Sequence, residues 1–225
     1  LPKIINKKVL LIFDFDGTIA DSVDIKTQAF AELYTPYGNE IVDQVVEYHL
    51  LHGGTSRFDK FRYFHREFLD IKLSESEIRD LTNIFSKLVI DKVVNAPYIT
   101  GAFEFISKNY NEFDMFISTA TPSDEINEIL IRKNLKKYFV KVLGSPDSKS
   151  DHVSKIISES KYTLNETIFI GDSNSDKEAA DQNDLIFIEV CYGKKIKEGE
   201  FKINDFLSLN NILKSIDKGK KKWRK

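Results

Sequence analysis

The sequence is poor in cysteine: Cys191 is the only one among 225 residues, so no disulfide can form within the chain. It also lacks any apolar run close to the roughly 20 residues that a membrane-spanning helix needs. The longest such runs are residues 9–13 and 185–188. No signal-peptide pattern is recognisable at the beginning, and together with the absence of disulfides this predicts a cytoplasmic protein.

A large excess of one charge is also missing, because 33 Lys and Arg residues stand against 35 Asp and Glu residues, a net charge of -2. This balance gives no reason to expect nucleic acid or a membrane surface as a partner. The segment 218–225 (KGKKKWRK) is basic, but a short basic terminus is usually solvated, and we interpret it as a partly disordered tail. The sequence is compatible with a monomer or a homodimer.

The hydrophobic pattern divides the chain into a helical block and an alternating block. Residues 8–13 (KVLLIF) are typical of a buried parallel strand that ends at Asp14. Between residues 21 and 110 the apolar spacing is helical, and Ser74 followed by Glu77 indicates a capping box. Beyond Pro97, strands are predicted at 113–118, 140–143, 167–170 and 186–190, and helices at 123–134, 151–160 and 176–182.

Alternating strands and helices predict an α/β fold, a Rossmann-like parallel sheet with helices on both faces. Residues 1–20 and 97–225 would form this discontinuous core, and residues 21–96 an inserted α-helical cap domain. Ligands of such sheets bind beyond the carboxyl ends of the strands. Polar side chains directly follow three of the apolar runs, namely Asp14, Ser118 and Asp172.

Two pairs of carboxylates lie at predicted strand ends. Asp14 and Asp16 are two residues apart in extended chain, so their side chains point the same way and repel unless a cation or proton lies between them. Asp172 and Asp176 follow a later strand, where an N-cap and a first-turn aspartate are an equally good interpretation. Together, four carboxylates with no nearby histidine or cysteine favour Mg²⁺ over zinc.

Ser118 and Lys149 are weaker candidates when each is considered alone. Ser118 ends a predicted strand, where it also fits the N-cap of the helix that opens near Pro122. Lys149 precedes another predicted helix, where an exposed lysine is the ordinary interpretation.

In order and spacing these segments resemble the motifs of the haloacid dehalogenase superfamily, specifically its phosphatase-type members with a helical cap. Residues 14–18 (DFDGT) resemble the DxDGT signature, and residues 117–122 (ISTATP) resemble the second motif, a strand ending in Ser or Thr. Residues 144–149 (GSPDSK) are similar to the lysine-bearing segment, and residues 171–176 (GDSNSD) to the GDxxxD metal motif. The resemblance covers residues 8–190. Within the superfamily, the sequence is most similar in kind to phosphoglycolate phosphatases and β-phosphoglucomutases.

The resemblance implies a covalent mechanism with Mg²⁺ as cofactor. Asp14 would attack phosphorus and form an aspartyl phosphate, and Asp16 would act as the general acid and base. Asp14, the backbone carbonyl of Asp16 and Asp172 would hold the metal, with Asp176 acting through water or as an outer orienting group.

The resemblance also implies contacts to the substrate. Ser118 and Lys149 would neutralise the phosphoryl oxygens. Thr18, expected to support Asp16, and Thr119, next to Ser118, are further candidates for substrate binding.

The predicted cap contributes its own candidates through the loop 52–57 (HGGTSR). Glycines such as Gly54 would let this loop approach a substrate, and Arg57 would pair with an anionic group; a plain helix connection with Arg57 on the surface is the alternative. Lys60 is available for the imine chemistry of a phosphonate hydrolase, but nothing in the sequence marks it as desolvated.

The sequence therefore predicts a Mg²⁺-dependent phosphohydrolase that acts on a small phosphorylated metabolite, a phosphate monoester. The alternative within the superfamily is a phosphomutase of the β-phosphoglucomutase type. The alternative from a different class is a non-catalytic binding protein on the same fold, against which the complete set of acids and the lysine argue.

Overall fold

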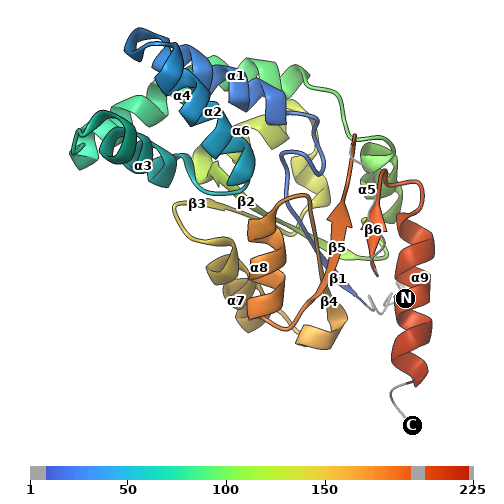
Figure 1. Cartoon of the computed structure of the whole chain (residues 1–225). Helices are drawn as coiled ribbons and strands as arrows, with labels where there is room; N and C mark the ends of the chain where they lie inside the picture. Colours follow the sequence, from blue (N-terminus) through green and yellow to red (C-terminus); the bar gives the residue numbers. More distant parts are fainter. Residues whose placement is uncertain (1–8, 194–200, 223–225) are drawn as a thin grey trace.

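The computed structural model of the chain describes residues 9–193 and 201–222 (Figure 1). Its centre is a six-stranded parallel sheet with strand order β3-β2-β1-β4-β5-β6. The strands are β1 (Leu10–Phe13), β2 (Asp114–Pro122), β3 (Lys141–Ser145), β4 (Thr167–Gly171), β5 (Ile186–Val190) and β6 (Lys202–Ile203). The predicted α/β, Rossmann-like sheet is confirmed.

Strand β1 lies at the point where the strand order reverses. Ile12 is in register with Phe116 of β2 on one side and with Phe169 of β4 on the other. The chain builds β2 and β3 on one side of β1 and then returns to build β4, β5 and β6 on the other. Crevices that bind ligands form at such reversals, beyond the carboxyl ends of the strands.

Helices cover both faces of the sheet because the apolar side chains of β1 alternate between them. Leu11 and Phe13 belong to one hydrophobic cluster, and Leu10 and Ile12 to the other. The first cluster includes side chains of α5 (Ala102–Asn109), α6 (Ser123–Arg132) and α9 (Leu209–Lys222). The second includes side chains of α7 (Lys149–Glu159) and α8 (Asn174–Gln182).

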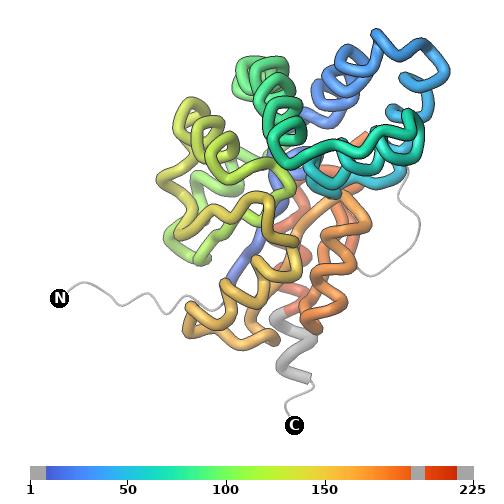
Figure 2. The backbone as a smooth tube through the Cα atoms, turned by 90° about the vertical axis from the view of Figure 1, so that its left-hand side faces the viewer, coloured from blue at the N-terminus to red at the C-terminus, as the bar shows by residue number. Residues whose placement is uncertain are grey.

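The segment between β1 and β2 contributes a helical layer above the carboxyl ends of the strands, which we call the cap (Figures 1 and 2). Its helices are α1 (Val23–Tyr34), α2 (Asn39–Leu51), α3 (Arg57–Leu69) and α4 (Glu75–Asn95). The rings of Phe61, Phe64 and Phe85 all contact Phe30, which explains why the apolar spacing there is helical. The predicted capping box of Ser74 and Glu77 opens α4. Three short 3₁₀ helices complete the described elements: η1 (Thr35–Tyr37), η2 (Lys136–Tyr138) and η3 (Leu164–Glu166).

Some boundaries differ from those predicted. Strand β2 continues past Ser118 to Pro122, and helix α7 begins at Lys149 rather than at Asp151. Helix α5 lies within residues 21–110, where the apolar spacing is helical, but helix α9 and the short strand β6 were not predicted. Helix α9 includes residues 218–222 of the basic tail, and residues 223–225 lie outside the described part of the chain. Among the described helices, none has the length and hydropathy needed to cross a bilayer.

Candidate active site

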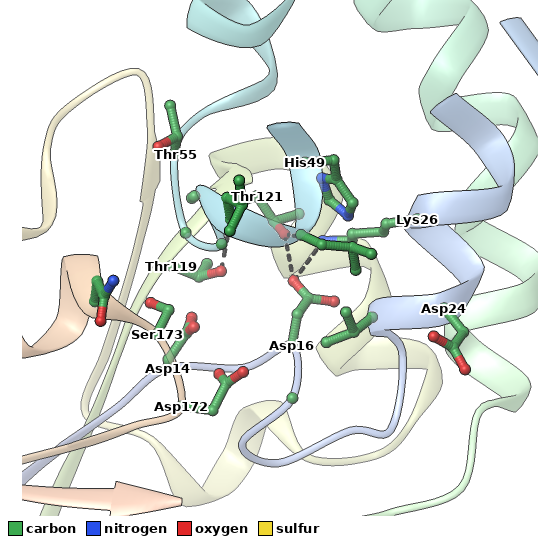
Figure 3. A pocket seen from close by; sticks show the side chains of 18 of the residues that line it. Asp14, Asp16, Asp24, Lys26, His49, Thr55, Thr119, Thr121, Asp172 and Ser173 are labelled. Carbon is green, nitrogen blue, oxygen red and sulfur yellow. Dashed lines mark hydrogen bonds and ion pairs between the residues drawn. The ribbon is translucent and has the colours of Figure 1, made fainter. Parts of the chain in front are cut away.

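A pocket of about 870 Å³ lies between the cap and the carboxyl ends of the strands (Figure 3). The core contributes carboxylates to its wall, including Asp14, Asp16 and Asp172. The cap contributes cationic and imidazole side chains, namely Lys26, His49, Arg57 and Lys60. Carboxylates therefore line the core side of the pocket, and basic side chains line its cap side.

Asp14 follows β1 directly and is 4% exposed. Its Oδ1 accepts a hydrogen bond of 2.7 Å from the backbone N–H of Phe15, and its Oδ2 lies 2.9 Å from Lys149 Nζ. Burial raises the pKa of Asp14 to about 8; the charges of Asp176, Asp172 and Asp16 add to this effect, and Lys149 opposes it. A second cation beside Asp14 would restore the carboxylate form.

Asp14, Asp172 and Asp176 form a cluster whose carboxylate oxygens lie within 4.8 Å of one another. Gly17 permits this approach, because a Cβ at that position would lie 2.9 Å from Asp172 Oδ1, and its φ of 78° also favours glycine. A single lysine, Lys149, pairs with two of these three carboxylates, Asp14 and Asp176, so excess negative charge is left, and oxygen donors suit Mg²⁺. The residues therefore fit the metal that the sequence predicts.

Lys149 is the first residue of α7, and its position follows from the helix cap. The Ser148 side chain accepts a hydrogen bond from Asp151 N–H, which fixes the helix start and turns the next side chain inward. Lys149 Nζ lies 2.6 Å from Asp176 Oδ1 and is 5% exposed. Burial alone would lower the pKa of Lys149, but Asp14 and Asp176 raise it well above its ordinary value.

Asp176 takes the structural role at the helix start and still turns one carboxylate oxygen toward the other acidic residues. It belongs to a capping box with Ser173 at the start of α8, and its other oxygen faces Lys149.

Asp16 is held by three neighbours, two of which, Lys26 and Thr121, are labelled in Figure 3. It forms an ion pair with Lys26 of α1, accepts a hydrogen bond of 2.9 Å from Thr121 Oγ1 and accepts one of 2.6 Å from Ser22 Oγ. Burial would raise the pKa of Asp16, but Lys26 and the two hydroxyls lower it below the ordinary value. Asp16 is therefore charged in this arrangement.

The hydroxyl groups of Ser118 and Thr18 do not lie where the sequence predicts them. Ser118 is fully buried and bonds His152 Nδ1 at 3.0 Å, whereas Thr119 lines the pocket. Neighbouring residues of a strand face opposite sides, so only one of the two can face the substrate. Thr18 does not support Asp16; its hydroxyl donates to Asp172 Oδ1 at 3.2 Å.

The cap loop brings Gly54 to the pocket, whereas Arg57 pairs with a carboxylate of the protein itself. Gly54 lines the pocket, and a Cβ there would lie 3.0 Å from Lys149 Nζ. Arg57 is also at the pocket wall, but its guanidinium forms a bidentate ion pair with Glu125 of α6. Lys60, which no sequence feature marked as desolvated, is 2% exposed.

Sequence reasoning missed Lys26, Thr121, His49 and Glu125. Thr121 had a detectable signal, because it lies two residues beyond Thr119 on a strand that continues to Pro122. Lys26, His49 and Glu125 had none, since their partners lie 10, 11 and 68 positions away, beyond the reach of a local pattern.

A model of the haloacid dehalogenase-like hydrolase family matches residues 11–190. No curated protein sequence matches the chain significantly. Solved structures share the fold: YfnB, a HAD-hydrolase from Bacillus subtilis bound to magnesium, has 20% identity and a TM-score of 0.70 over 93% of this chain and 100% of that one.

Two further structures extend the comparison. A protein described as a phosphoglycolate phosphatase from Haemophilus somnus has 15% identity and a TM-score of 0.70, covering 93% of this chain and 99% of its own. The β-phosphoglucomutase from Clostridium difficile has 19% identity and a TM-score of 0.74, covering 93% and 97%. At these identities the likeness concerns the fold. Because the family match spans most of the sequence, the chain belongs to the haloacid dehalogenase-like hydrolases.

Proposed function

We propose that this hydrolase is a Mg²⁺-dependent phosphatase that cleaves small phosphate monoesters through an aspartyl phosphate on Asp14. The observation that carries the proposal is the environment of Asp14. A carboxylate at the end of a central strand contacts one buried lysine and lies within 4.8 Å of two further carboxylates, beside a pocket large enough for a small metabolite.

Asp14 suits the role of nucleophile because its backbone and one oxygen are fixed. The Asp14 N–H donates to the carbonyl of Ile170 at 2.9 Å, and Oδ1 accepts from Phe15 N–H. A carboxylate oxygen held in this way attacks phosphorus, and the bond from phosphorus to the leaving oxygen breaks. Lys149 neutralises charge on the phosphoryl oxygens, and Thr119, rather than Ser118, offers the hydroxyl on the pocket side.

Asp16 would act as the general acid and then as the general base. As a carboxylate it would first bind a proton, when the negative charge of the bound phosphate raises its pKa, and then protonate the leaving oxygen. The carboxylate that results would take a proton from the water that hydrolyses the aspartyl phosphate. Its lowered pKa favours the second task, since a charged carboxylate is the form that accepts a proton.

Asp14, Asp172 and Asp176, with the backbone carbonyl of Asp16, would hold Mg²⁺, which when bound neutralises the carboxylates and the phosphoryl oxygens.

The test is phosphate release from a panel of phosphorylated metabolites. Mg²⁺ should support release, EDTA should stop it, and Ca²⁺ should restore it poorly because its coordination is larger and looser. Asp14→Asn serves as the control for contaminating phosphatases and should be inactive. Restoration by Zn²⁺ alone would contradict the oxygen-ligand site.

The phosphomutase alternative uses the same residues, so only the fate of the phosphoryl group separates the two. A phosphatase passes it to water, and ¹⁸O from solvent should appear in released phosphate. Isomerisation of a sugar phosphate faster than phosphate release would favour the mutase.

A further inference from the structure

Lys60 is a buried cation at the pocket wall, and no carboxylate of the described residues pairs with it. It lies on α3 of the cap with 2% of its surface exposed. Its Nζ lies 2.9 Å from His49 Nδ1 and 5.7 Å from the centroid of the Phe30 ring. Within residues 9–193 and 201–222, no acidic side chain forms an ion pair with it.

The other cations at this site are all neutralised. Lys26 pairs with Asp16, and Arg57 pairs with Glu125. Lys149 pairs with two aspartates, Asp14 and Asp176. An ammonium group that is buried without a counter-ion is costly, and a ligand that supplies the missing negative charge removes that cost.

His49 adds a buried ring nitrogen, Nε2, that has no partner among the described residues. It is 7% exposed at the pocket wall, and its Nε2 forms no hydrogen bond with any described residue. Burial lowers the pKa of His49 to about 3, so the ring stays neutral, and its Nδ1 can accept a hydrogen bond from a charged Lys60. The proton then lies on Nε2, which becomes a second donor beside the pocket.

We propose that Lys60, positioned by His49, is the counter-ion for a second anionic group of the substrate, a carboxylate or a second phosphate. The inference rests on the proposed function, which places the reacting phosphoryl group at Asp14 and Lys149. Lys60 bonds to neither of those residues and projects from the opposite, cap side of the pocket. It therefore meets the end of the substrate that does not react.

The protonation state of Lys60 supports this role and makes it measurable. Burial first, and then the charges of Lys26, Lys149 and Arg57, lower the pKa of Lys60 to about 7, while Asp16 opposes the shift. An anion bound beside the amine raises that pKa. Binding should therefore be accompanied by proton uptake above pH 7 and by little uptake well below it.

The experiment measures binding of unreactive probes to the Mg²⁺-loaded protein by titration calorimetry. The acids phosphonoacetate, 3-phosphonopropionate and 4-phosphonobutyrate are each compared with the alkylphosphonate of equal carbon number. At least one acid should bind about tenfold or more tightly than its partner, the cost of losing one charged hydrogen bond. Propane-1,3-bisphosphonate tests whether a second phosphonate replaces the carboxylate.

Variants assign the preference to the amine. Lys60→Met should remove the preference for the acids, and Lys72→Met, an exposed cap lysine, should keep it. Lys60→Arg should keep the preference but abolish the extra proton uptake, because arginine does not lose its proton in this range. Proton uptake is obtained from binding enthalpies in buffers of different ionisation enthalpy, and a thermal melt confirms that each variant folds.

The outcomes separate this proposal from the phosphatase itself. If Lys60→Met weakens acids and alkylphosphonates equally, Lys60 serves the reacting group, and the proposal is wrong while the proposed function stands. If the wild-type protein binds each of the three acids no more tightly than the alkylphosphonate of equal carbon number, the proposal is also wrong. A protein that binds neither class of probe with Mg²⁺ contradicts both.

Discussion

Arg57 of the cap helix α3 donates hydrogen bonds of 2.7 and 2.6 Å to the two carboxylate oxygens of Glu125 on the core helix α6. The two side chains are 4% and 3% exposed, and Ser86 of α4 bonds to both. This ion pair joins the cap to the core. Because both terminal nitrogens are engaged, Arg57 does not offer the substrate contact that the sequence suggested.

Removing one member of this pair should destabilise the protein. Arg57→Ala leaves Glu125 buried and unpaired, at a cost of about 3–5 kcal/mol in the free energy of unfolding. The double variant Arg57→Met with Glu125→Leu should recover much of that loss, because no buried charge is left over. Denaturant titrations measure both. A single variant as stable as wild type would show that the pair is not buried in solution.

Asp14 should make the metal-free protein less stable as the pH rises. Its pKa is about 8 in the folded state against 3.8 ordinarily, so between these values the folded chain binds more protons than the unfolded one. The free energy of unfolding therefore falls with increasing pH across this window. Asp14→Asn should lack this slope, and Mg²⁺ should remove it in the wild type. Parallel melting curves for both proteins without metal would contradict the raised pKa.

Asp16 should matter most for substrates with poor leaving groups. Asp16→Asn cannot protonate a departing alkoxide, so alkyl phosphates should lose about 10²–10⁴-fold in turnover. An aryl ester such as p-nitrophenyl phosphate should lose less in the first step, since its leaving group departs without a proton. Steady-state and burst kinetics on both esters measure the difference. Equal losses in the burst phase would exclude Asp16 as the acid.

The sequence was sufficient for the parts of the site that depend on local order. The apolar run before Asp14 and the strand before Asp172 predict two strand ends, and parallel pairing brings those ends together at one edge of the sheet. The capping box at Ser74 was equally local. The helical spacing of the cap reflects its buried aromatic rings.

The incorrect predictions concern side chains whose placement depends on where a strand ends or on a partner that is distant in the sequence. Ser118 was preferred because the strand was expected to end there, but β2 continues to Pro122, and the alternation places Thr119 on the pocket side. The pairing of Arg57 with Glu125 joins residues 68 positions apart, and nothing in the local pattern reports it.

Covalent trapping of the phosphoryl group tests the central claim most directly. Wild-type protein with Mg²⁺ is mixed with an active monoester, quenched rapidly in acid, reduced with borohydride and digested for mass spectrometry. An aspartyl phosphate at position 14 is reduced to homoserine, so the peptide that contains Asp14 should carry that change, and Asp14→Asn should carry none. Efficient turnover with the change at another residue, or with no covalent change in single-turnover time courses, would contradict the assignment of Asp14 as the nucleophile.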